Sequence, residues 1–282
     1  MKKIGILGRG TMAIGIAQIF AQSGNEVMVW VRSIDKGSPR ASLAPLEKTL
    51  DRLVSRERIT AAQMGNTLKN ISITDSYEDL KDCDLIIEAI AENMDLKKSV
   101  FKALDSICKE ETILATNTSS LSITEMANAT NRPDKVIGMH FFNPVPVMNL
   151  VEVIKGISTS EETKNAIFEM TTKVGKTPVE IEEAPGFVVN RILIPMINEA
   201  IGIFAEGIAS AEHIDESMKL GANHPMGPLA LGDLVGLDVC LAIMDVLYEE
   251  FGDSKYRAHP LLRKMVRGNV LGRKTKKGFF QY

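Results

Sequence analysis

The sequence contains a histidine and a glutamate whose types and spacing suit a reaction centre, because two neighbouring strands would bring them together. His140 ends the run KVIGMH, and Glu152 lies twelve residues later in LVEVI, a spacing that predicts two paired strands. Imidazole exchanges protons near neutral pH, and a carboxylate on one ring nitrogen would orient it and stabilise its charged form. A lone histidine on a strand is more often a hydrogen-bonded structural residue, so the sequence around His140 must decide between the catalytic and the structural role.

A glycine turn lies near the amino terminus. Residues 8–13 read GRGTMA, directly after the strand-like KIGIL and at the start of a helical pattern. Gly8 permits a tight turn, and Gly10 lets the backbone approach a pyrophosphate. The helix beginning at Thr11 and Met12 offers unpaired N–H groups to phosphates. This setting predicts a dinucleotide site, and a turn that merely joins strand to helix is the alternative.

The residues after the second predicted strand bear on the choice of cofactor. That strand ends at Val31, where NAD-binding chains usually carry an acidic residue for the ribose 2′-hydroxyl. Arg32 and Ser33 would instead bind a 2′-phosphate through a charge-assisted bond and a hydroxyl. Further positive charge would come from Arg9, Lys36 and Arg40. We predict NADP(H) as the preferred cofactor; NAD(H) without its acidic anchor, with Arg32 in solvent, is the alternative.

The order of the predicted elements indicates two domains. Through the first half, β-branched runs alternate with helical patterns, which predicts an α/β fold of Rossmann type with a parallel sheet. Beyond Pro185 and Gly186 long helical patterns dominate, among them GPLALGDLVGLDVCLAIMDVLYEEFG. We expect a dinucleotide-binding domain over residues 1–185. An all-helical domain over residues 186–282 would contact substrate and form a homodimer.

Composition limits the partners. The 282 residues are 45% hydrophobic with a formal charge of −3, so nothing attracts the chain as a whole to nucleic acid or to an anionic membrane. Three scattered cysteines indicate neither a disulfide framework nor a metal site. No stretch has the length of a membrane helix, and the short apolar start is typical of a strand. We expect a cytoplasmic protein.

Long stretches carry a resemblance that covers nearly the whole chain: TNTSSLSITE at 116–125, GMHFFNPVPVMNLVEVI at 138–154 and EAPGFVVNRILIPMINEA at 183–200. By these the sequence resembles the (S)-3-hydroxyacyl-CoA dehydrogenases, above all the short bacterial members that act on 3-hydroxybutyryl-CoA. The resemblance implies interconversion of acetoacetyl-CoA and (S)-3-hydroxybutyryl-CoA by hydride transfer. The departures from the common NAD-type members fall at the cofactor: Arg9, Ala13, Val31 and Arg32.

The resemblance also implies roles for single residues. His140 would be the general acid and base, with Glu152 orienting it. Ser119 and Asn190 match polar contacts to the 3-oxygen of the substrate, although a serine before LSITE could equally start a helix. The residues implied near the nicotinamide and its ribose are Glu92, Lys97 and Asn117. For the charged segment EAIAENMDLKKSVF, an ordinary helix start is the alternative.

A basic helix would meet the phosphates of coenzyme A. In EKTLDRLVSRERI, Lys48, Arg52 and Arg56 fall at four-residue steps, so one helix face carries all of them. The resemblance favours a CoA site, and a solvated face paired with neighbouring acidic residues is the alternative.

Two rival functions remain open. A dehydrogenase for another small hydroxyacid would keep the fold, but it would not need the basic helix. A non-catalytic NADPH-binding protein would keep the glycine turn, but it gives no reason to retain His140 and Glu152 together.

Overall fold

The computed structural model describes residues 1–34 and 39–282, and the chain divides into two compact units, Met1–Glu183 and Ala184–Tyr282. The expected domain boundary at residue 185 lies next to this division. Two of the predicted cofactor contacts cannot be followed, because Lys36 and the side chain of Arg40 lie outside the described part of the chain.

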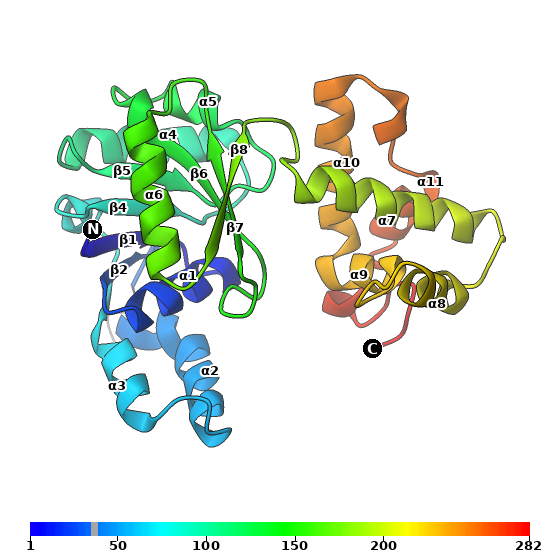
Figure 1. The fold of residues 1–282 in the computed structure, drawn as a ribbon, viewed down its shortest axis with the longest axis horizontal. Coiled ribbons are helices and arrows are strands. Elements are labelled where there is room, and N and C mark those ends of the chain that lie inside the picture. The colour runs from blue at the N-terminus through cyan, green and yellow to red at the C-terminus, as the bar shows by residue number, and fades with distance from the viewer. Residues whose placement is uncertain (35–38) are drawn as a thin grey trace. The chain divides into compact units, whose positions relative to one another are not determined.

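The described part of the first unit holds a sheet with the strand order β3-β2-β1-β4-β5-β6-β7-β8 (Figure 1). Its strands are β1 (Lys3–Leu7), β2 (Glu26–Trp30), β3 (Ile71–Thr74), β4 (Leu85–Glu88), β5 (Ile113–Thr116), β6 (Val136–Phe141), β7 (Leu150–Lys155) and β8 (Thr177–Glu182). Neighbouring strands are parallel except β6 and β7, which are antiparallel. The predicted Rossmann-type sheet followed by a helical domain is confirmed.

Helices cover both faces of this sheet. On one face α1 (Thr11–Gln22), α2 (Ala44–Ser55) and α6 (Glu161–Lys173) share a core with the strands, and α3 (Ala61–Lys69) packs against α1 and α2. Side chains alternate along each strand, so Gly138 faces the other side, where it meets Ile123 of α5 (Ile123–Ala127). There α4 (Met94–Ile107) packs against α5. Short 3₁₀ turns complete the unit: Pro39–Leu43, Tyr77–Leu80 and Pro133–Lys135.

The second unit is helical. It consists of α7 (Val189–Ala205), α8 (Ala211–Gly221), α9 (Pro228–Val235), α10 (Leu237–Phe251) and α11 (Pro260–Arg267), with 3₁₀ turns at Ser254–Tyr256 and Arg273–Thr275. These helices enclose a core of their own. The stretch expected as one helical pattern after Gly227 is two helices, because Gly236 adopts a φ of 103° between them. None of the described helices is long and apolar enough to span a membrane.

Candidate active site

Several predicted site residues of the first unit lie at one edge of the sheet. Strands β1, β4, β5 and β6 are mutually parallel, so their carboxyl ends share that edge. The predicted residues Gly8, Asn117 and His140 lie at or just beyond these ends, and Glu88, which the sequence analysis did not single out, ends β4 at the same edge. Ligands of open α/β sheets bind outside this edge. Asn190 belongs to the second unit, where it is half-buried at the start of α7.

His140 and Glu152 form a buried pair. The register of β6 and β7 sets the two residues directly opposite each other, and His140 Nδ1 lies 2.7 Å from Glu152 Oε2. Their exposed fractions are 6% and 1%. The Phe142 ring packs on the imidazole with the ring centres 4.5 Å apart. A carboxylate at Nδ1 holds the ring in one orientation with its hydrogen on that nitrogen.

The glycine turn has room for a dinucleotide backbone. Gly8 has a φ of 126°, and a Cβ there would lie 2.5 Å from the carbonyl oxygen of Ala89, so a larger residue would clash. A Cβ on Gly10 would meet nothing within 4 Å, and α1 starts there without a side-chain cap. The first N–H groups of a helix, here those of Thr11 and Met12, lack intrahelical partners. The turn therefore fits a pyrophosphate, which the positive end of the helix favours.

The segment after β2 carries positive charge at the place where NAD-binding chains usually carry an acidic residue for the ribose 2′-hydroxyl. β2 ends at Trp30, and Val31 is buried with its N–H bonded to the last carbonyl of β3. Arg32 and Ser33 follow on the surface, and Arg9 is exposed in the glycine turn. Within residues 1–34 and 39–282, no ion pair occupies the guanidinium of Arg32.

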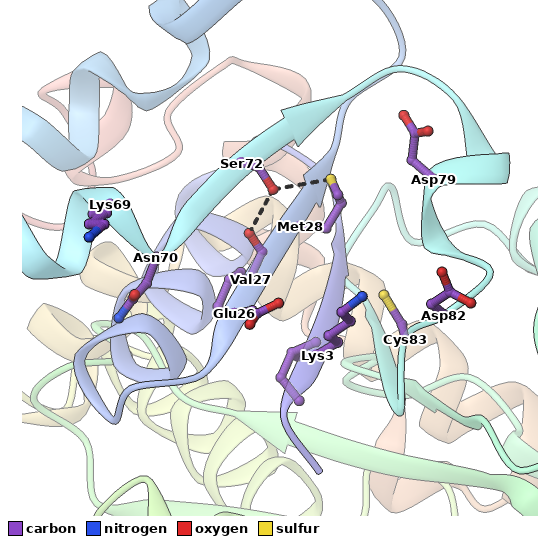
Figure 2. A pocket seen from close by; sticks show the side chains of 11 residues that line it. Lys3, Glu26, Val27, Met28, Lys69, Asn70, Ser72, Asp79, Asp82 and Cys83 are labelled. Carbon is purple, nitrogen blue, oxygen red and sulfur yellow. Dashed lines mark hydrogen bonds between the residues drawn. The ribbon is translucent and has the colours of Figure 1, made fainter.

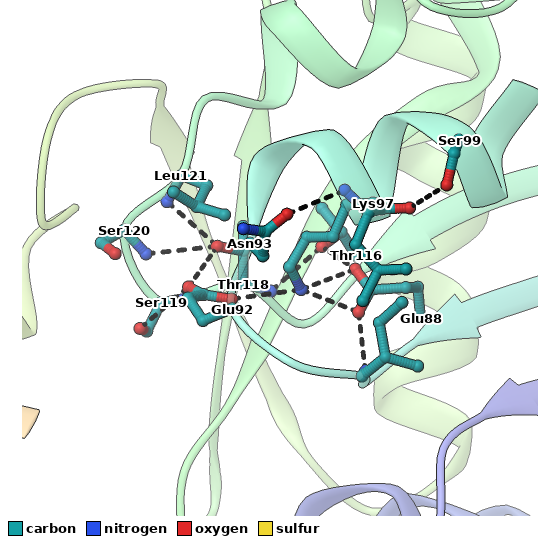
Figure 3. A network of polar contacts seen from close by, with 12 residues as sticks. Glu88, Glu92, Asn93, Lys97, Ser99, Thr116, Thr118, Ser119, Ser120 and Leu121 are labelled. Atoms are coloured by element: carbon teal, nitrogen blue, oxygen red, sulfur yellow. Dashed lines mark hydrogen bonds and ion pairs between the residues drawn. The ribbon is translucent and has the colours of Figure 1, made fainter. Parts of the chain in front are cut away.

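Glu92 lies in a polar network that reaches Ser119 (Figure 3). One oxygen of Glu92 accepts hydrogen bonds from the Thr118 hydroxyl at 2.6 Å and from the N–H and hydroxyl of Ser119 at 2.9 and 3.2 Å. The other lies 3.1 Å from Lys97 Nζ. Burial raises the pKa of Glu92, but the Lys97 charge and these hydrogen bonds outweigh it, so the pKa lies below its ordinary value. Glu92 therefore stays ionised at neutral pH.

Lys97 lies beneath the surface of this network. Its side chain is 1% exposed, whereas that of Glu92 is 38% exposed. Its ammonium lies 2.7 and 2.8 Å from the two oxygens of Glu88, a buried carboxylate. Lysine has three N–H donors, and these contacts with Glu88 and Glu92 direct all of them at carboxylate oxygens. Of the two residues predicted at the ribose, Glu92 is thus the one at the surface.

Asn117 and Ser119 have structural partners that the sequence left open. The Asn117 side-chain oxygen accepts the N–H of Phe141 at 2.9 Å, which ties the end of β5 to the residue after His140. Ser119 does not cap α5, because Ser122 fills that position and accepts a backbone N–H. The hydroxyl of Ser119 is directed at Glu92 instead.

Two family models together match almost the whole sequence. Residues 3–184 match the NAD binding domain of 3-hydroxyacyl-CoA dehydrogenase, and residues 186–282 match its C-terminal domain. The chain belongs to the 3-hydroxyacyl-CoA dehydrogenase family. The resemblance predicted from its motifs is confirmed.

Individual members of the 3-hydroxyacyl-CoA dehydrogenase family align with this chain over more than nine-tenths of their own length. A 3-hydroxybutyryl-CoA dehydrogenase of Clostridioides difficile is 62% identical over 280 residues, which cover 99% of this chain and 99% of that protein. The mitochondrial hydroxyacyl-coenzyme A dehydrogenase of Homo sapiens is 41% identical, and the alignment covers 100% of this chain and 91% of that protein. The crystal structure of (S)-3-hydroxybutyryl-CoA dehydrogenase from Ralstonia eutropha superposes on this chain with a TM-score of 0.95 at 50% sequence identity. The superposition covers 100% of this chain and 99% of that one.

The basic helix of this dehydrogenase-family chain is α2. Lys48 and Arg52 lie within it, Arg56 is its C-cap residue, and all three are exposed. Among the residues that the structure describes, no ion pair joins these cations to a carboxylate. The alternative was that neighbouring acidic residues pair with the cations on this helix face, and the contacts of the described residues do not support it.

A hollow of about 350 Å³ lies elsewhere on the first unit (Figure 2). Lys3 and Glu26, which line it, begin β1 and β2, and Asn70 directly precedes β3. The hollow therefore lies toward the amino ends of the strands, away from the glycine turn and His140. We assign it no part in the dehydrogenase site. Nor do the described residues contain a histidine, cysteine and carboxylate cluster that could hold a metal ion.

Sequence reasoning missed Glu88, Thr116 and Thr118, which join the network behind Glu92. A signal for Glu88 was present, because this acidic residue ends the otherwise apolar and fully buried strand LIIE at the edge where ligands bind. The two threonines carried no such signal, since threonine is ordinary in and after strands.

Proposed function

We propose that this chain interconverts acetoacetyl-CoA and (S)-3-hydroxybutyryl-CoA, with NADP(H) as its preferred cofactor. The observation that carries the proposal is the buried His140–Glu152 pair, 2.7 Å apart, at the ligand-binding edge of a dinucleotide-binding sheet. The full-length relatives named for 3-hydroxybutyryl-CoA support this choice of substrate.

His140 serves as the general base in oxidation and as the general acid in reduction. Its Nε2 takes the proton of the 3-hydroxyl, and it returns a proton to the 3-oxygen in the reverse direction. A bound nicotinamide would supply the hydride acceptor for oxidation and the hydride donor for reduction at carbon 3 of the substrate. Glu152 keeps Nδ1 protonated and stabilises the imidazolium formed by proton uptake. Ser119 and Asn190 hydrogen-bond the 3-oxygen and stabilise charge that develops there.

The cofactor would be held along the sheet edge. The glycine turn, with the helix start at Thr11 and Met12, receives the pyrophosphate. Arg32 and Ser33 bind the 2′-phosphate, since Val31 supplies no carboxylate to repel it. Glu92, anchored by Lys97, and Asn117 lie at the nicotinamide end.

The phosphates of coenzyme A would bind the exposed face of α2. Lys48, Arg52 and Arg56 provide positive charge with no carboxylate paired to it among the described residues. An acyl-CoA needs such a local cluster, because the chain as a whole is slightly acidic.

Initial rates of acetoacetyl-CoA reduction with NADPH and NADH, at subsaturating cofactor and fixed ionic strength, test the proposal. We expect faster reduction with NADPH. In Arg32→Asp a charge-assisted hydrogen bond worth about 1.5–3 kcal/mol is lost, so KM for NADPH should rise at least about tenfold while KM for NADH changes little. Lys173→Asp, an exposed change of the same charge at the end of α6, is the matched control.

The outcomes separate the alternatives. A clear NADH preference, or equal losses for both cofactors in Arg32→Asp, would contradict the 2′-phosphate site and leave the reaction standing. No rate with either cofactor would contradict the substrate and favour another hydroxyacid or a binding protein without turnover.

A further inference from the structure

Glu88, the buried acidic residue bonded to Lys97, has no contact with solvent. Glu88 ends β4 and is 0% exposed. Its oxygens accept hydrogen bonds from the Ile90 N–H at 2.7 Å and the Thr116 hydroxyl at 2.7 Å, besides both contacts from Lys97 Nζ. A buried carboxylate is costly unless it is paired and hydrogen-bonded, and here each oxygen is.

The position of Lys97 depends on Glu88. Lys97 lies in the first turns of α4, and its ammonium bridges Glu88 and Glu92. Both oxygens of Glu88 lie within 2.8 Å of Nζ, against 3.1 Å for the Glu92 oxygen. The shorter and doubled contact makes Glu88 the anchor of the ammonium.

The position of Glu92 depends in turn on Lys97. Glu92 stands in the loop between β4 and α4, and Figure 3 shows it between Lys97 on one side and Thr118 and Ser119 on the other. Half-exposed, it reaches the surface where a ligand would lie. A shift of the ammonium would therefore move this carboxylate and, with it, the hydrogen bond that directs the Ser119 hydroxyl.

We propose that Glu88 is a positioning residue that, through Lys97, sets the place of Glu92 and the orientation of the Ser119 hydroxyl at the nicotinamide end of the site. Glu88 is 0% exposed, so it can act on a ligand only through the residues that it contacts. The proposal rests on the proposed function, which puts the nicotinamide ribose and the 3-oxygen of the substrate at these residues.

The test compares two ligands on Glu88→Gln. NADPH reaches the nicotinamide end, whereas adenosine 2′,5′-bisphosphate lacks that half of the cofactor. Glutamine keeps the shape but removes the charge that anchors Lys97, so we expect Kd for NADPH, followed by its fluorescence, to rise about tenfold. Kd for adenosine 2′,5′-bisphosphate should stay within about twofold.

Glu111→Gln is the matched control, because it removes the same charge from an exposed side chain two residues before β5 and leaves the contacts of Glu88 and Lys97 in place. We expect it to bind both ligands as the unaltered protein does. Should Glu88→Gln fail to fold, Glu88→Asp keeps the charge and withdraws it by one CH₂ group, and the same split between ligands should appear with a smaller factor.

Equal losses for both ligands, or no loss for NADPH in a folded Glu88 variant, would overturn the proposal. The titration is repeated with NADH and ADP. Because it measures binding and needs no turnover, a wrong substrate or cofactor preference in the proposed function would not be mistaken for failure of the Glu88 assignment.

Discussion

At the scale of single residues, the Glu152 carboxylate is the group that would stabilise a protonated His140. Glutamine at position 152 can still hydrogen-bond the ring but carries no charge to stabilise the imidazolium. We expect kcat for acetoacetyl-CoA reduction in Glu152→Gln to fall by about 10²-fold or more, with KM for the cofactor within about twofold. Steady-state kinetics would measure both. Glu169→Gln, an exposed change on α6, should leave kcat unaltered, and an unaltered kcat in Glu152→Gln would contradict the dyad.

The residues of the site differ in how far sequence can reveal them. His140 and Glu152 lie on strands close together in sequence, so a short spacing was enough to predict their pairing. Glu88 and Lys97 meet only after β4 and α4 have folded on each other, and burial then removes Lys97 from the surface where it was expected. Such a network depends on packing between elements, which no local pattern records.

At the scale of elements, Asp84 ties the start of β1 to the start of β4. Its carboxylate accepts the N–H groups of Lys2 and Lys3 at 2.6 and 3.2 Å and lies 2.6 Å from Lys109 Nζ. Burial raises the pKa of Asp84, but these hydrogen bonds outweigh it and lower the pKa to about 2. A pKa lowered in the folded state adds stability above the unfolded value, and that stability is lost as pH falls toward the folded one.

We therefore expect Asp84→Asn to lower the free energy of unfolding at pH 7 by about 1 kcal/mol, a figure reduced for the partial exposure of the side chain. The deficit should shrink as pH falls from about 4 toward 2. Urea unfolding at a series of pH values would measure it, with the exposed Asp82→Asn as control. A deficit that stays constant over this range would show that charge is not its source.

The sequence analysis did not predict the antiparallel direction of β7 or the helix break at Gly236, and the physical reasons differ. The antiparallel β7 did have a signal, because only residues 142–149 separate it from β6, too few for a parallel crossover of about a dozen residues. The break at Gly236 had a weaker one. Glycine suits this position because its φ is 103°, a backbone conformation that residues with a side chain rarely adopt, and that angle is set by the folded chain.

At the scale of the whole molecule, exposed apolar side chains are unevenly distributed. Among the described residues, ten of the sixteen large apolar side chains that remain exposed belong to residues 184–282, the smaller unit. Ile192 and Ile208 are each 68% exposed, and Leu220 is 80% exposed. This many exposed apolar side chains on one unit favour their burial by another protein, and a second copy of the chain is the partner that the helical unit was predicted to bind.

Sedimentation equilibrium tests this prediction. We expect a species of twice the 30.9 kDa chain mass, held together through the helical unit. The double variant Ile192→Glu/Ile208→Glu would place unpaired carboxylates in that interface, so it should shift the protein toward the monomer mass. Ile157→Glu, at a side chain 87% exposed on the first unit, is the control and should leave the dimer intact. A monomeric unaltered protein, or dissociation by the control alone, would place the apolar surface outside any dimer interface.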